Sequence, residues 1–191
     1  NLVNGPGLGI VTASGEFRLL PYFPPFFPLT LAFFTWLGCD AEQAALWLNI
    51  LLFGLTIVTA GWLLFRSGVG RRLALLGASL ITVSPVLIPT FSWAMAEPLA
   101  IWLGLLSLGL LLVYLDRQGS TLLLIAAGWA AGLSILTRYS MAAFLAAEMA
   151  GLFLLNKGNW RVRLGRLAGF SIAGILPGLI WMGFDFSRTA T

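Results

Sequence analysis

Long apolar runs separated by short polar breaks form the dominant pattern of the chain. A helix needs about 20 mostly apolar residues to cross the hydrocarbon core of a bilayer, so these runs predict membrane-spanning helices. The predicted spans are residues 44–65, 73–91, 98–115, 121–137, 140–156 and 167–184. The expected fold class is therefore all-α, a polytopic membrane bundle of about six transmembrane helices.

The fourth and fifth spans are short, and only Arg138 and its neighbours separate them. They form either one run broken by a tight turn or two helices. Two helices are favoured, because a single helix over the whole run would overshoot the hydrocarbon core of about 30 Å.

Residues 1–43 differ from the rest and are expected to form an extracytoplasmic segment ahead of a bundle at 44–191. Residues 1–27 are predicted to be a loop, since four prolines among residues 21–28 oppose a regular helix. The apolar run 29–37 is too short to span and predicts a juxtamembrane or re-entrant helix.

Short signals mark the ends of two of these elements. Gly38 is expected to end the juxtamembrane helix. Asp40, followed three residues later by Gln43, is typical of a capping box and predicts the N-cap of the next helix.

Composition and charge exclude several function classes. Hydrophobic residues make up 59% of the chain and charged residues 9%, which leaves too little polar surface for a soluble fold. The net charge of +4 does not indicate nucleic-acid binding, because eight of the eleven basic residues lie in short loops between apolar runs. These are Arg66, Arg71, Arg72, Arg117, Lys157, Arg161, Arg163 and Arg166. Such loops mark the cytoplasmic side of a membrane protein.

Alternation of the spans then places Glu97 and Arg138 together at the extracytoplasmic face, in a chain expected to lie among the lipids of a cell or inner membrane. Cys39 is the single cysteine and histidine is absent. An intrachain disulfide, a zinc site and an imidazole base are therefore not expected.

Four polar residues interrupt the apolar pattern. Glu97, which precedes Pro98, either helps to start a helix or has a functional role. Arg138 either marks a helix boundary by snorkelling or meets water, a partner or an anion such as a lipid phosphate. Glu148 is protonated, bonded to another helix, or facing a polar cavity. A polar lock between helices is favoured for Glu148, and Asn49 has the same interpretation.

Small residues recur at four-residue spacing, which predicts close helix packing, either inside this bundle or with helices outside this sequence. The pairs are Gly128/Gly132, Gly165/Gly169 and Gly174/Gly178.

Four short motifs occur in an order that resembles a known family. They are Asn1–Gly7, the Pro24–Pro28 block, Met95–Pro98 and Ala131–Tyr139. On this topology the chain resembles membrane glycosyltransferases of the GT-C superfamily, in the protein O-mannosyltransferase and lipid A aminoarabinose transferase group. The resemblance covers nearly the whole chain, although each motif is short.

The resemblance implies transfer of a sugar from a polyprenyl-phosphate-linked donor to an acceptor at the extracytoplasmic face, with sugar and acceptor left open. In such families the principal carboxylate base lies in the first outer loop, shortly after the first span. That stretch is expected upstream of Asn1, so the chain is expected to be a fragment that is inactive by itself.

The resemblance also implies roles for single residues. Glu97 would have a supporting catalytic role, orienting a sugar or helping to hold a divalent cation if one is used. Arg138 would stabilise the departing phosphate, with Arg18 as a weaker candidate. The Pro24–Pro28 block would shape the wall where a lipid carrier enters. The expected substrate-binding residues are Arg138, Tyr139, Arg18, Pro24 and Pro25.

Two other functions stay open from the sequence. A transporter or flippase of lipid-linked sugars would also use intramembrane charges, but transporters often show internal repeats and a midplane site, and this sequence indicates neither. A non-catalytic membrane assembly subunit would explain the glycine spacing but not the placement of Glu97 and Arg138.

Overall fold

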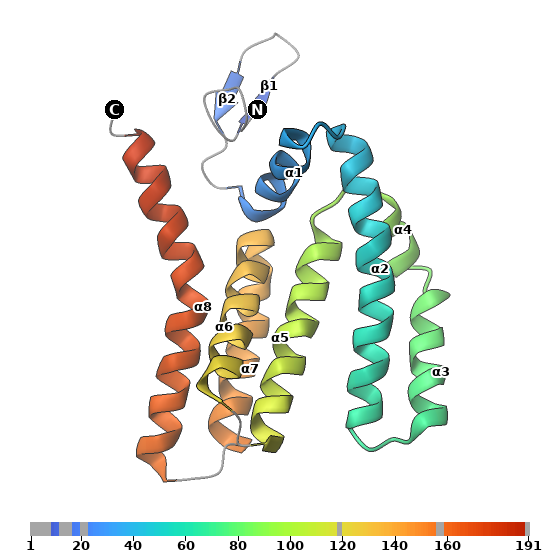
Figure 1. Cartoon of the computed structure of the whole chain (residues 1–191), viewed down its shortest axis with the longest axis vertical. Helices are drawn as coiled ribbons and strands as arrows, with labels where there is room; N and C mark the ends of the chain where they lie inside the picture. The colour runs from blue at the N-terminus through green and yellow to red at the C-terminus, as the bar shows by residue number, and fades with distance from the viewer. Residues whose placement is uncertain (1–8, 12–16, 20–22, 118–119, 156–158, 190–191) are drawn as a thin grey trace.

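The computed structural model describes residues 9–11, 17–19, 23–117, 120–155 and 159–189, and long helices standing side by side dominate this part (Figure 1). Among these residues, three helices are long and apolar enough to cross a membrane. They are α2 (Ala41–Arg66), α5 (Glu97–Arg117) and α8 (Trp160–Thr189). The shorter apolar helices are α1 (Phe26–Trp36), α6 (Thr121–Thr137) and α7 (Ala142–Leu155), the last preceded by a 3₁₀ turn, η1 (Tyr139–Met141). The predicted all-α membrane fold is confirmed.

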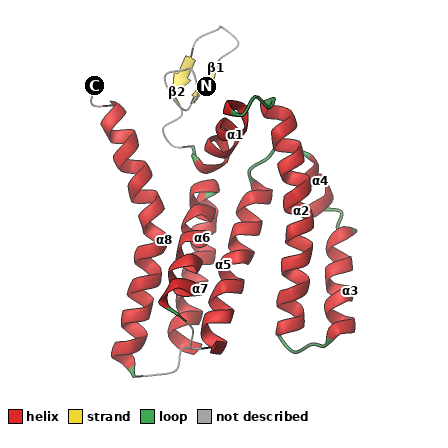
Figure 2. Ribbon diagram, in the orientation of Figure 1, coloured by secondary structure: helices red, strands yellow, loops and turns green. Residues whose placement is uncertain are grey.

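The N-terminal segment contains more regular structure than predicted. Two short strands, β1 (Gly9–Val11) and β2 (Phe17–Leu19), pair antiparallel where a loop was expected (Figure 2). Helix α1 begins at Phe26 and includes Pro28, which the proline argument placed outside any helix. Pro28 fits because it lies in the first turn, where its missing N–H has no intrahelical acceptor to lose.

The junction between α1 and α2 follows the predicted signals. Gly38 adopts a φ of 90°, a left-handed conformation that favours glycine, just after the end of α1. The Asp40 carboxylate then accepts hydrogen bonds from the backbone N–H groups of Glu42 (3.0 Å) and Gln43 (3.1 Å). The predicted N-cap of α2 is therefore confirmed.

The predicted span 73–91 is wrong as one continuous helix. The chain forms α3 (Arg71–Thr82) and then a separate short helix, α4 (Leu87–Ser92). Pro85 explains the break, because its ring excludes the i−4 hydrogen bond and disfavours helical backbone at Ser84. Together α3 and α4 return the chain to the end of the bundle where α2 began (Figure 1).

The break at Arg138 separates two helices, as favoured from the sequence. Helix α6 ends at Thr137, and Arg138 has extended backbone with φ −151° and ψ 119°. The chain then re-enters helical structure through η1 and α7.

The last helix begins earlier than the predicted boundary at residue 167. Helix α8 starts at Trp160, and the Asn159 side chain accepts a hydrogen bond from the Val162 N–H (3.0 Å). Arg161, Arg163 and Arg166 therefore lie on the first turns of a helix and not in a loop. Lys157 lies outside the described residues.

A close helix–helix contact joins α6 to α8 through glycines. A Cβ on Gly128 would stand 2.6 Å from the Phe170 carbonyl oxygen, and one on Gly132 would overlap the Gly174 backbone. Close packing is thus confirmed for Gly128, Gly132 and Gly174. A Cβ on Gly165 or Gly178 would meet nothing within 4 Å, so these two glycines make no close helix contact within the described residues.

Two buried hydroxyls join helices across the bundle. Ser107 on α5 donates to Glu148 Oε2 on α7 (2.9 Å), and Glu148 is 4% exposed, which confirms the predicted polar lock. Ser134 on α6 donates to the Ala100 carbonyl on α5 (2.9 Å). These bonds fix the positions of α5, α6 and α7 relative to one another along the helix axes.

Gly132→Ala is expected to lower the melting temperature in detergent, because the new methyl group would push α6 away from α8. Overpacking of this kind costs about 1–3 kcal/mol in the free energy of unfolding. Gly178→Ala is the matched control, since its Cβ meets nothing within 4 Å. Equal melting temperatures for the two variants would contradict the glycine interface.

Candidate active site

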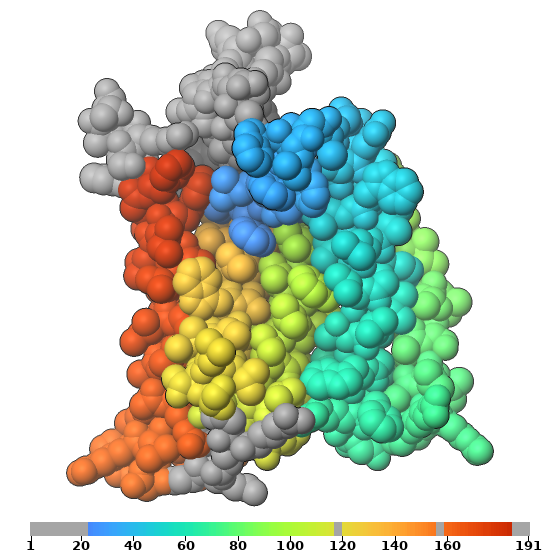
Figure 3. All heavy atoms as spheres, in the orientation of Figure 1, coloured from blue at the N-terminus to red at the C-terminus, as the bar shows by residue number. Residues whose placement is uncertain are grey.

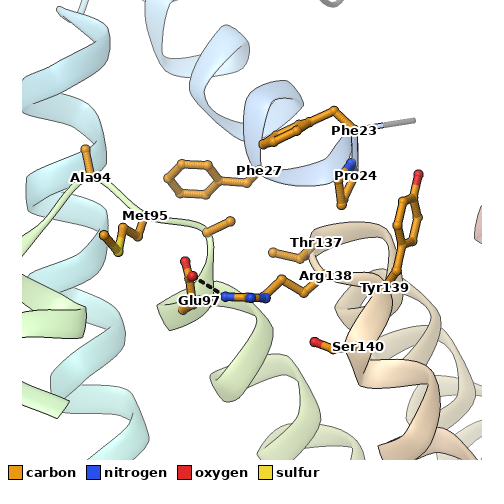
Figure 4. Close-up of a pocket in the computed structure, with 11 residues that line it drawn as sticks. Phe23, Pro24, Phe27, Ala94, Met95, Glu97, Thr137, Arg138, Tyr139 and Ser140 are labelled. Carbon is orange, nitrogen blue, oxygen red and sulfur yellow. Dashed lines mark hydrogen bonds and ion pairs between the residues drawn. The ribbon is translucent and has the colours of Figure 1, made fainter. Parts of the chain in front are cut away.

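A cavity of about 520 Å³ opens at the end of the bundle where the chain is least regular (Figure 4). It lies between α1, the turn that joins α4 to α5, and the break between α6 and α7. Its lining residues are Phe23, Pro24, Phe27, Ala94, Met95, Ala96, Glu97, Thr137, Arg138, Tyr139 and Ser140.

The basic chain segments lie at the other end of the bundle. Figure 1 shows the α2–α3 connection and the start of α8 at the same end of the bundle, away from the cavity. Arg66, Arg71, Arg72 and Arg161 belong to these segments. The predicted separation of a basic end from an end carrying Glu97 and Arg138 is therefore present in the fold.

Glu97 is the first residue of α5, and its half-buried side chain faces the cavity. Pro98 occupies the next helical position and is buried. This order suits a helix start, because proline tolerates the first turn and a carboxylate is favoured near the positive end of the helix dipole.

Arg138 reaches across from the end of α6 and forms an ion pair with Glu97, from Nη1 to Oε1 (Figure 4). The side chains of Arg138 and Glu97 are 46% and 32% exposed, so a ligand entering the cavity can reach both. One contact uses a single guanidinium nitrogen, and the planar fork has further N–H donors for an anion.

Aromatic and apolar side chains form the rest of the wall. Phe23, Pro24 and Phe27 approach from the start of α1, and Tyr139 projects from the break between α6 and α7 (Figure 4). Helix α1 lies across the upper ends of α5 and α6 (Figure 3). The cavity therefore combines one charged pair with a largely apolar surface.

Four of the predicted site residues meet in this cavity: Glu97, Arg138, Tyr139 and Pro24. Pro25 is fully buried as the N-cap of α1 and does not line it. Arg18 lies in β2 with its backbone opposite Ile10, and its side chain is outside what the structure describes. The Asn1–Gly7 motif lies outside the described residues.

Sequence reasoning missed the direct pairing of Glu97 with Arg138 and the role of Phe27 as a buried side chain in the wall. Alternation of the spans already put both charged residues at one face, and this signal could have suggested the pair. Nothing local in the sequence distinguishes Phe27 from the other aromatic residues near it.

The described residues contain no group of three or more His, Cys, Asp or Glu side chains that could hold a metal ion. Glu97 is the single carboxylate among the described residues that line the cavity, and it is already paired with the Arg138 guanidinium. Hard divalent cations take several oxygen ligands, so these residues do not fit a metal centre.

Comparison with known proteins identifies one family. A family model described as dolichyl-phosphate-mannose-protein mannosyltransferase matches residues 23–181. The match includes every residue of the cavity lining. No curated protein and no solved structure matches the chain.

The Glu97–Arg138 pair is expected to contribute little to folding, because exposed ion pairs are worth at most about 1 kcal/mol. A double-mutant cycle of Glu97→Gln and Arg138→Gln, read by unfolding in detergent, should give a coupling energy below that value. The Arg66–Asp116 pair (2.8 Å) at the opposite end, with side chains 27% and 57% exposed, is the control. A coupling energy well above 2 kcal/mol at Glu97–Arg138 alone would make the pair a structural element.

Proposed function

The chain belongs to the dolichyl-phosphate-mannose-protein mannosyltransferase family, and we propose that it transfers a sugar from a polyprenyl-phosphate-linked donor to an acceptor at the extracytoplasmic face. Membership makes it a membrane glycosyltransferase of the mannosyltransferase type. The donor, the face and the residue roles are the proposal.

The observation that carries the proposal is the accessible Glu97–Arg138 pair in a cavity remote from the basic end of the bundle. Basic loops favour the cytoplasmic side, so the cavity would open on the opposite side of the membrane. A lipid-linked sugar there would present its phosphate at the level of the helix ends, where Arg138 lies.

Glycosyl transfer breaks the bond between the anomeric carbon and the donor phosphate oxygen, and the acceptor hydroxyl oxygen forms the new bond. The departing polyprenyl phosphate takes the electron pair, while a base takes the hydroxyl proton. Arg138 would stabilise the negative charge on the phosphate through its remaining N–H donors. Glu97, held by Arg138, would orient a sugar hydroxyl as a hydrogen-bond acceptor.

The wall of the cavity suits the two halves of such a donor. Tyr139 is 49% exposed and offers an aromatic face to a sugar ring. Phe23, Pro24 and Phe27 offer apolar surface to the first isoprenoid units of the carrier. Pro25 would act indirectly, by fixing the start of α1.

Arg18 remains a weaker candidate for the phosphate. Arg18 lies five residues before Phe23 in the chain. This separation in sequence is short enough for Arg18 to approach the cavity wall. Its role is tested by the same assay as that of Arg138.

The test is transfer of labelled sugar from a panel of polyprenyl-phosphate donors by the full-length protein in nanodiscs. Arg138→Ala is expected to reduce kcat/KM by about 100-fold or more, because the departing phosphate loses its guanidinium. Arg138→Lys should restore part of it, since a point charge replaces the planar fork. Glu97→Gln should lower kcat with a smaller effect on KM.

Arg72→Ala is the control, because it removes an exposed arginine at the opposite end. Unchanged turnover in Arg138→Ala would contradict the phosphate role. Absence of transfer from every donor, together with movement of intact lipid-linked sugar across vesicles, would instead support a transporter.

A further inference from the structure

We infer that Asn49 on α2 is a positioning residue for the active site, which fixes Glu97 by holding the backbone turn before α5. The inference rests on the proposed function for its catalytic consequence. Its structural part, the hold on the turn, stands on geometry alone.

Asn49 makes two hydrogen bonds to backbone far away in the sequence. Its Nδ2 group donates to the carbonyl oxygens of Trp93 (2.6 Å) and Met95 (3.2 Å), and the residue is 0% exposed. Both partners are acceptors only, so the amide must present its nitrogen to them. The orientation of this side chain follows from the bonds themselves.

The turn that Asn49 holds leads directly into Glu97, the first residue of α5. Residues 93–96 leave helical geometry, and the Met95 N–H bonds back to the Trp93 carbonyl (2.8 Å). The Ala96 carbonyl then accepts from the Ala100 N–H (3.2 Å) in the first turn of α5. Glu97 is two residues beyond Met95. The position of the turn along the bundle therefore sets the position of the Glu97 carboxylate.

The same turn is also part of the cavity wall. Ala94, Met95 and Ala96 all line the cavity together with Glu97. Asn49 thus bonds the backbone of the segment that carries these four consecutive lining residues.

Apart from the turn that it bonds, Asn49 has apolar surroundings. It lies on α2 between Ala45 and Leu52, members of an apolar cluster that also includes Phe27, Phe91 and Leu99. Its Oδ1 atom is buried without a hydrogen-bond partner among the described residues. A buried acceptor without a donor is unfavourable, and an apolar side chain here would avoid it. The amide instead bonds the Met95 carbonyl and adds a second hydrogen bond to the Trp93 carbonyl, which already accepts from the Met95 N–H.

Thr56 provides a matched control on the same helix. It lies seven residues after Asn49, on the same face of α2, and is 2% exposed. Its hydroxyl has no partner among the described residues. Thr56→Val therefore removes a buried polar group from α2 without affecting the turn.

The first test is a double-mutant cycle on sugar transfer by the full-length protein in nanodiscs. Asn49→Leu is expected to lower kcat about 10-fold or more with little change in KM, because a displaced Glu97 no longer meets the reacting sugar. In a Glu97→Gln background the same change should lower kcat less than twofold, because the group it positions is already altered. Thr56→Val should leave kcat unchanged. Equal losses in both backgrounds would overturn the positioning role.

The second test does not depend on activity. Hydrogen exchange of peptides covering residues 93–98 should become at least several-fold faster in Asn49→Leu, and not in Thr56→Val. Exchange that stays at the wild-type rate would overturn the hold on the turn. If the wild-type protein transfers no sugar, the proposed function fails, while this measurement still decides the structural part.

A conservative variant keeps the inference testable if Asn49→Leu does not fold. Asn49→Gln retains the amide but moves it by one methylene group. If both variants fold, the kcat of Asn49→Gln should lie between those of the wild type and Asn49→Leu. If Asn49→Leu does not fold, the kcat of Asn49→Gln should still be lower than that of the wild type. Wild-type kcat and wild-type exchange in both substitutions would overturn the inference.

Discussion

The rest of this structure depends on the need to satisfy backbone hydrogen bonds where no water is present. In hydrocarbon each N–H and C=O must find a hydrogen-bond partner within the protein, and a regular helix supplies these partners within one segment. Irregular backbone is therefore confined to helix ends or supported by other groups. The Trp93–Ala96 turn and the extended residue Arg138 are two such places, and they face each other across the cavity.

The charged pair in the cavity forms because α5 begins where α6 ends, at the same end of the bundle. The start of α5 carries Glu97 and the end of α6 carries Arg138, and their relative height is fixed by the Ser134 bond to Ala100 (2.9 Å). Ser134 also accepts, through its carbonyl, the Arg138 N–H (2.9 Å). One buried residue thus links the backbone of Arg138 to the helix that carries Glu97.

Helix packing holds the bundle together below the cavity, and a few buried hydrogen bonds add to it. Glycines bring α6 and α8 into backbone contact, which favours association in lipid through van der Waals contacts. Glu148 and Ser107 add one hydrogen bond between α5 and α7. The Glu97–Arg138 pair takes no part in these contacts, and both of its side chains are accessible from the cavity.

The sequence by itself determined the membrane class, the helix boundaries near Asp40 and Arg138, and the separation of a basic end from the end with Glu97. These features depend on hydropathy, chain length and local capping, all of which act within one segment. Pro85 indicated the break between α3 and α4, but the continuous apolar run around it favoured a single span. The tertiary structure alone decided that Glu97 pairs with Arg138, that Phe27 closes the cavity wall, and that Asn49 holds residues 93–95. Each of these requires the packing distance and relative height of helices far apart in the chain, and no local pattern encodes those quantities.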